Sequence, residues 1–197
     1  ADEVLVALKD EVGLAGVYHM RHTALPENRF VKGQPDKGAD LADDLLRFCR
    51  LGPDDPQNGW VEHARMLQRR ARVMTKRNFR SLLFRGPGTE LEVGLAHDGV
   101  WLGGGGPTPN GRMTYPNFPT EEVFTTPVAG ATSGTFRCTT PLSFNGRVID
   151  GIAGAFARGR LTRIDASRPS DRELLSRTFA TDSGAGRLGE VALVDDS

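Results

Sequence analysis

Two glutamates in apolar, strand-like runs are the residues of this chain best suited to chemistry. Glu122 follows Glu121 in residues 117–127, Asn-Phe-Pro-Thr-Glu-Glu-Val-Phe-Thr-Thr-Pro, and Glu190 lies in residues 188–194, Leu-Gly-Glu-Val-Ala-Leu-Val. A carboxylate in apolar surroundings costs several kcal/mol unless it is paired, hydrogen-bonded or bound to a cation. The two runs therefore predict a metal site or an acid–base site.

The spacing of the two glutamates leaves a second interpretation open. Glu122 and Glu190 are far apart in the sequence, so only tertiary structure can bring them together. Carboxylates that converge from different strands are ligands for divalent ions in hydrolytic sites. A structural ion pair with an arginine, such as Arg112 or Arg187, accounts for these carboxylates equally well.

Other motifs that could do chemistry give weaker signals. The four histidines His19, His22, His63 and His97 are scattered and lack the helical HExxH frame of a zinc protease, and no GxSxG motif is present. We expect His63 to pack at the flank of a helix. The four glycines at 103–106 lack the GxxxxGK[ST] pattern of a P-loop, which favours a flexible loop or a close approach of two backbone segments.

The clearest element is a helix that begins at Asp55-Pro56, an N-cap residue followed by proline at the first helical position. Its apolar residues recur at spacings of four, three, four and three: Trp60, Ala64, Leu67, Ala71 and Met74. Basic residues cover its other faces: Arg65, Arg69, Arg70, Arg72 and Lys76. This basic cover indicates either a binding surface for an acidic ligand or a solvated helix face.

After this helix the apolar period changes to about two, which is typical of strands. We predict strands over residues 79–84, 90–95 and 100–102, and two or three more over 135–164 with turns at Asn145-Gly146 and Arg158-Gly159. Ser170 to Glu173 form a predicted capping box that opens a helix through Phe179. The pattern predicts an α+β fold with a mixed, mainly antiparallel sheet flanked by the two helices. The strand with Glu190 is expected to lack a neighbour, and such an edge promotes association, for which a homodimer is a candidate.

Composition excludes several classes of protein. The 197 residues carry no net charge, which argues against nucleic acid or anionic membrane as a partner, and no apolar run approaches the ~20 residues of a membrane span. Cys49 and Cys138 form no disulfide framework, which fits a cytoplasmic protein. The first residue is Ala1, so we expect a processed chain or a piece of a longer one.

The order of motifs resembles the thermophilic-type metallo-aminopeptidases, the group of aminopeptidases T and S. The resemblance covers about residues 54–194, which predicts a partial catalytic domain over 54–197 after a poorly matched segment, 1–53. That segment contains helical patterns over 4–14 and 41–51. The matching strings are Trp60 with His63 and Leu67, Arg-Gly-Pro-Gly-Thr-Glu-Leu from 85, Trp-Leu-Gly-Gly from 101, the two glutamate runs, Pro141-Leu142 and Asp-Ser-Gly-Ala-Gly-Arg from 182.

The resemblance implies release of N-terminal residues from peptide substrates by two divalent metal ions, which are zinc, cobalt or magnesium depending on the enzyme. It implies Glu122 as a metal ligand, with Glu121 as the alternative. It also implies Glu190 as a metal ligand that helps to activate the attacking water.

The remaining ligands of the family, two histidines and an aspartate, belong to motifs that the 197 residues do not contain, as does the catalytic tyrosine. Two carboxylates alone bind hard cations weakly, so we expect little or no peptidase activity from this polypeptide by itself. The rival hypothesis is a non-catalytic binding or interaction module that retains the aminopeptidase scaffold without a complete metal site.

Overall fold

The computed structural model describes residue 50, residues 56–115 and residues 120–194. The helices predicted over 4–14 and 41–51 lie outside this part of the chain, apart from Arg50, which is in a turn. The same is true of the boundary predicted at 53/54. None of the described helices is long and apolar enough to cross a membrane.

Helix α3, Pro56–Arg77, is the long predicted helix, and its start at a proline is confirmed. The predicted stripe is its buried side, with Leu67 and Met74 fully buried and the other three members of the stripe at most 5% exposed. Burial of one such side chain contributes about 1.5–3 kcal/mol. Leu67, Ala71 and Met74 of the stripe join the main hydrophobic core with residues from both of the larger sheets.

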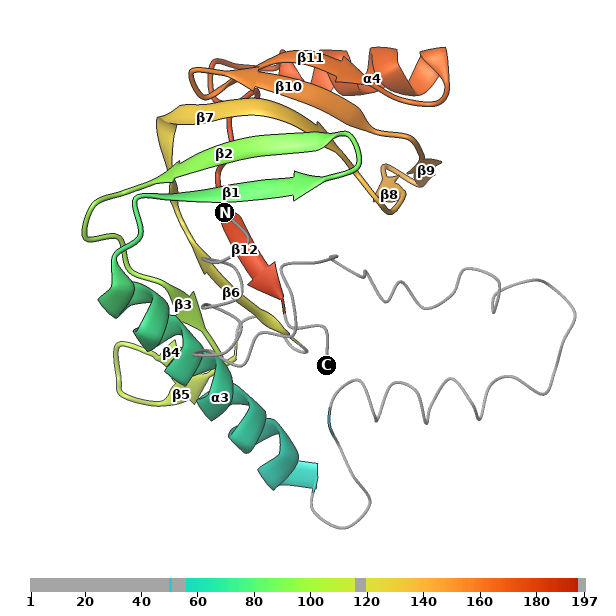
Figure 1. Cartoon of the computed structure of the whole chain (residues 1–197). Coiled ribbons are helices and arrows are strands. Elements are labelled where there is room, and N and C mark those ends of the chain that lie inside the picture. Colours follow the sequence, from blue (N-terminus) through green and yellow to red (C-terminus); the bar gives the residue numbers. More distant parts are fainter. Residues whose placement is uncertain (1–49, 51–55, 116–119, 195–197) are drawn as a thin grey trace, which may run out of the picture.

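The larger sheet has five antiparallel strands in the order β1-β2-β7-β10-β11. These strands are β1 (Ser81–Gly86), β2 (Thr89–Leu95), β7 (Pro127–Arg137), β10 (Ala153–Ala157) and β11 (Arg160–Asp165). Helix α4, Pro169–Phe179, lies along β11, at the opposite end of the molecule from α3 (Figure 1). A second, smaller core around Ile149, Ile152 and Leu175 joins α4 to this sheet.

A three-stranded sheet in the order β12-β6-β3 packs against α3. Its strands are β3 (Leu102–Gly103), β6 (Glu122–Thr125) and β12 (Val191–Val194). Two short hairpins complete the described residues: β4 (Gly106–Pro107) with β5 (Met113–Thr114), and β8 (Leu142–Phe144) with β9 (Arg147–Ile149). All strand pairings among these residues are antiparallel, and the predicted α+β fold is confirmed.

Several strand limits differ from the prediction. The strand predicted over 100–102 is Leu102–Gly103, because the backbone of the preceding residues bonds to threonine side chains instead of to a strand. The Val100 carbonyl accepts from Thr125 Oγ1 at 2.8 Å, and Trp101 N–H donates to Thr75 Oγ1 at 2.9 Å. The strand predicted over 79–84 is Ser81–Gly86.

Residues 135–164 form more strands than predicted: the end of β7, then β8, β9, β10 and β11. Both predicted turns are present there, because Asn145-Gly146 and Arg158-Gly159 adopt the positive φ angles typical of tight hairpins.

The capping box predicted at the start of α4 is wrong. The helix begins at Pro169, its N-cap is Arg168, and no side chain caps it. Proline supplies no backbone N–H and fits the first helical position, so the helix starts before Ser170 can act as its cap. Asp171 is instead fully buried, 2.6 Å from Arg168 Nε and 3.4 Å from Arg147 Nη2. It connects α4 to β9.

The glycine run at 103–106 allows two backbone segments to approach closely. Gly104 has φ +67°, and a Cβ there would lie 2.2 Å from the carbonyl oxygen of Ala64 in α3. Gln68 Nε2 also donates to the Gly104 carbonyl at 3.0 Å. Of the two expectations for this run, the close approach is therefore confirmed at Gly104, and it packs the β3 end of the sheet against α3.

Candidate metal site

The register of β6 and β12 places Glu122 and Glu190 on one face of the three-stranded sheet. Val191 pairs with Thr125, and Val194 pairs with Glu122. Side chains alternate between the faces of a strand. The buried residues Val123, Thr125, Val191 and Leu193 therefore form the face toward α3. Glu122 in β6, and Glu190 one residue before β12, belong to the opposite face.

The two carboxylates on this face influence each other electrostatically. Burial raises the pKa of the Glu122 carboxyl, and the negative charge of Glu190 raises it further. Glu122 is half-buried and Glu190 is exposed. No positively charged side chain among the described residues pairs with either of them. The pair is therefore an uncompensated concentration of negative charge, which a bound cation would relieve.

The two arginines considered as alternative partners do not compensate this charge. Arg187 Nη1 donates to the carbonyl of Ala129 at 2.6 Å, and Arg112 is exposed. Within residues 56–115 and 120–194, neither arginine forms an ion pair with Glu122 or Glu190. The ion pairs proposed from the sequence are thus not formed in this part of the chain.

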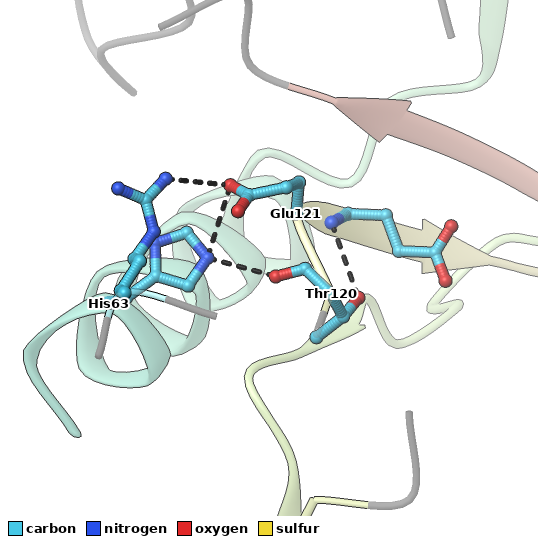
Figure 2. A network of polar contacts seen from close by, with 5 residues as sticks. His63, Thr120 and Glu121 are labelled. Atoms are coloured by element: carbon cyan, nitrogen blue, oxygen red, sulfur yellow. Dashed lines mark hydrogen bonds and ion pairs between the residues drawn. The ribbon is translucent and has the colours of Figure 1, made fainter. Parts of the chain in front are cut away.

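Glu121, the alternative ligand, is held by Arg50 and His63. Its Oε2 accepts a hydrogen bond from Arg50 Nη2 at 2.9 Å and lies 3.2 Å from His63 Nε2. Figure 2 shows the side chains of Glu121 and His63 directed toward one another. Adjacent residues of an extended chain face opposite ways, so this contact places Glu121 on the α3 side and leaves Glu122 on the other.

His63 fixes the segment just before Glu122. It is 5% exposed, and its Nε2 lies 2.9 Å from the carbonyl oxygen of Thr120 (Figure 2). A carbonyl oxygen only accepts, so Nε2 carries the hydrogen. Burial lowers the pKa of His63 more than any other influence, and the charges of Arg50 and Arg70 lower it further, against the raising effects of Thr120 and Glu121.

The sequence predicted flank packing for His63 but not this hydrogen bond. Its ring also packs against Trp60, with a centroid distance of 5.4 Å. The available signal was its position beside the Trp60 stripe, which places it on the buried side of α3. Its partners come from distant segments and carry no local signal.

The remaining predicted residues add no ligand. His97 is exposed and lies 2.7 Å from Asp98, while His19 and His22 lie outside the described residues. Among the described residues, no group of three or more His, Cys, Asp or Glu side chains is arranged to hold a metal ion. Glu122 and Glu190 fit a hard divalent cation by donor type, and other donors would have to complete its coordination.

The chain belongs to the thermophilic metalloprotease (M29) family, whose model matches residues 23–197. This confirms the resemblance found in the sequence, and the match begins inside the segment 1–53.

The relatives that match are aminopeptidases. Aminopeptidase T of Thermus aquaticus is 41% identical over 150 residues, which are 76% of this chain and 36% of the relative. Aminopeptidase PepS of Streptococcus thermophilus is 36% identical over 157 residues, 80% of this chain and 38% of the relative. The solved structure of wild-type AmpT from Thermus thermophilus superimposes with a TM-score of 0.67 at 43% identity, covering 71% of this chain and 34% of that one. The chain thus spans a little over a third of the curated relatives.

Proposed function

We propose that this chain contributes the two glutamate ligands of a metal-dependent aminopeptidase that releases N-terminal residues from peptides. The observation that carries the proposal is the uncompensated pair Glu122 and Glu190 on one sheet face of an M29 family member. The chain covers 36% of aminopeptidase T of Thermus aquaticus, and the aminopeptidase activity of that relative is extended to this chain as part of the proposal. The cofactors proposed are two divalent ions, zinc, cobalt or magnesium.

The two glutamates have different roles in this proposal. When bound, the divalent ions would supply Lewis-acid chemistry for hydrolysis of the peptide bond. Glu122, half-buried at the start of β6, is proposed as a metal ligand only. Glu190 is exposed beside β12, where solvent water reaches it, so it is proposed both as a ligand and as the group that accepts a proton from the attacking water.

His63, Arg50 and Glu121 are proposed to position Glu122. Their contacts fix residues 120 and 121 against α3, and the backbone N–H of Glu122 donates to Thr120 Oγ1 at 3.5 Å. A carboxylate ligand is effective only when its own position is held by the surrounding residues.

A metal titration tests the ligand assignment. We expect zinc or cobalt binding, followed by calorimetry, to weaken about tenfold or more in Glu122→Gln and in Glu190→Gln, because each substitution removes one anionic ligand. Glu92→Gln, an exposed glutamate in β2, is the matched control and is expected to bind like the wild type. Equal affinity in all four proteins would contradict the assignment.

The second candidate function is a binding module on the aminopeptidase scaffold. It is favoured by the absence, among the described residues, of a third ligand side chain near the two glutamates. Little release is expected from these 197 residues by themselves, so the two functions are separated by an assay in which the part of aminopeptidase T of Thermus aquaticus that this chain does not cover is added. Release of amino acids from a peptide amide that requires both this chain and cobalt or zinc supports the peptidase, whereas metal binding without release from the mixture supports the module.

Association and location remain proposals. Among the described strands, β12 is at the edge of the sheet β12-β6-β3, and an open edge favours a homodimer that pairs two copies there. Sedimentation of the wild type and of Ala192→Pro tests this dimer, because proline cannot donate a backbone hydrogen bond to a second copy.

A cytoplasmic location is supported by Cys138, which is a free thiol. Cell fractionation tests this location.

A further inference from the structure

One side of α3 carries a stripe of positive charge. Arg65, Arg69, Arg72 and Lys76 recur at spacings of four, three and four, so they share one face of the helix, and all four are exposed. In the described part of the chain, no carboxylate forms an ion pair with any of them. Glu62 is the acidic residue of α3, and it lies at the N-terminal end of the stripe. The chain as a whole has no net charge, so this concentration is local.

The C-terminal part of this basic stripe borders an open groove of about 490 Å³ between α3 and β3. Arg72 and Lys76 line one wall of the groove, and Val100 and Leu102 line the other, with Trp101 between them. Val100 is 60% exposed and Leu102 is 55% exposed, the highest values among the large apolar side chains of the described residues. The groove is large enough for one or two apolar side chains of a ligand.

We propose that the groove and the basic stripe together bind an acidic peptide segment of a partner protein. Apolar side chains of the segment would pack on Val100 and Leu102, and its carboxylates would face Arg69, Arg72 and Lys76. Charge complementarity selects an acidic ligand. The exposed groups beside the stripe are aliphatic, and bases of single-stranded nucleic acid stack on aromatic side chains, so a peptide fits the surface better.

The basic residues of this surface are separate from the proposed metal site. Arg69 and Arg72 are on α3, which covers one face of the three-stranded sheet, whereas Glu122 and Glu190 are on the other face. Leu102, at the β3 edge of the sheet, pairs with Phe124 and not with either glutamate. Binding of the acidic peptide should therefore be unchanged in Glu122→Gln, so this inference can fail or succeed independently of the aminopeptidase proposal.

Fluorescence anisotropy with the whole 197-residue chain tests the proposal. The probe is a short labelled peptide in which glutamate and leucine alternate. We expect Arg69→Glu/Arg72→Glu and Val100→Asp each to weaken binding about tenfold, and we expect about 1 M salt to weaken wild-type binding. The matched controls are Arg163→Glu and Val148→Asp. Arg163 is exposed on β11 of the five-stranded sheet and Val148 is exposed on β9, so both variants should bind the peptide like the wild type.

Several results would overturn the proposal: no binding to the wild type, equal loss in the control variants, or equal binding of a peptide with glutamine in place of glutamate. Tighter binding of an oligonucleotide, lost in the same variants, would show a nucleic-acid surface instead. Val100 lies outside the helices and strands, so Val100→Asp decides the outcome if the double variant melts at a lower temperature than the wild type.

Discussion

At the scale of residues, two adjacent carboxylates have opposite environments. Glu121 contacts two cationic or polar partners on the α3 side, whereas Glu122 faces the charge of Glu190. The sequence identified Glu122 and Glu190 as the candidate ligands, but it left Glu121 open as the alternative. Which of two adjacent strand residues faces the core depends on the contacts that the strand makes with its neighbours. Here the contacts of Arg50 and His63, which come from distant segments, hold Glu121 on the α3 side.

Opposite environments predict opposite effects of the same substitution in metal-free protein at neutral pH. Glu121→Gln removes an ion pair and should cost about 1 kcal/mol, because both partners are partly exposed. Glu122→Gln removes an uncompensated charge and should raise the Tm by about 1–3 °C. Thermal melts in the presence of a chelator check both, with Glu92→Gln as control.

The stabilising effect of Glu122→Gln should also depend on pH. A carboxyl with a raised pKa in the folded state binds its proton more tightly there than in the unfolded state. Its contribution to stability is therefore lost as pH rises from the ordinary range of a glutamate through the raised pKa. The gain in Glu122→Gln should be small in acid and grow toward neutral pH; a gain that is largest in acid contradicts this assignment.

At the scale of elements, the spacing of apolar residues predicted α3 and the β1–β2 hairpin well. An element that is buried on one side needs apolar residues at the spacing of its own side chains, about 3.6 residues in a helix and two in a strand. They did not predict the limits of β3 or the start of α4. Those limits depend on Thr75, Thr125 and Asp171, whose partners are brought near by the fold.

The packing of β3 on α3 predicts a strong effect at one glycine of the run. Gly104→Ala should destabilise the protein by about 2 kcal/mol or more, since the new Cβ meets the Ala64 carbonyl and the residue must keep a positive φ. Gly106→Ala is the control in the same run, because a Cβ there has nothing within 4 Å. Urea unfolding measures both, and equal midpoints for the two variants would refute the close approach.

The start of α4 supplies another test, between the capping box and the buried ion pair. Asp171→Ala should cost about 1.5–3 kcal/mol, because it removes the buried carboxylate that accepts a charge-assisted hydrogen bond from Arg168 and pairs with Arg147. Ser170→Ala should change stability by less than about 0.5 kcal/mol, as an exposed residue that caps nothing. A loss of about 1 kcal/mol in Ser170→Ala would restore the capping box.

At the scale of the whole molecule, the fold class and the family followed from the sequence, and both are confirmed. The sequence could not show that Glu122 and Glu190 share one face of the sheet, because this depends on the antiparallel register of β6 and β12. It also could not show that the basic face of α3 borders an apolar groove, because Val100 and Leu102 reach α3 only through the fold of the three-stranded sheet.

The most direct test of the central claim is anomalous X-ray scattering from crystals of this chain grown with zinc. We predict a zinc peak bonded to carboxylate oxygens of both Glu122 and Glu190, at about 2.0–2.2 Å. A zinc ion bound elsewhere, with the two carboxylates turned apart or each paired with a cationic side chain, would contradict the claim.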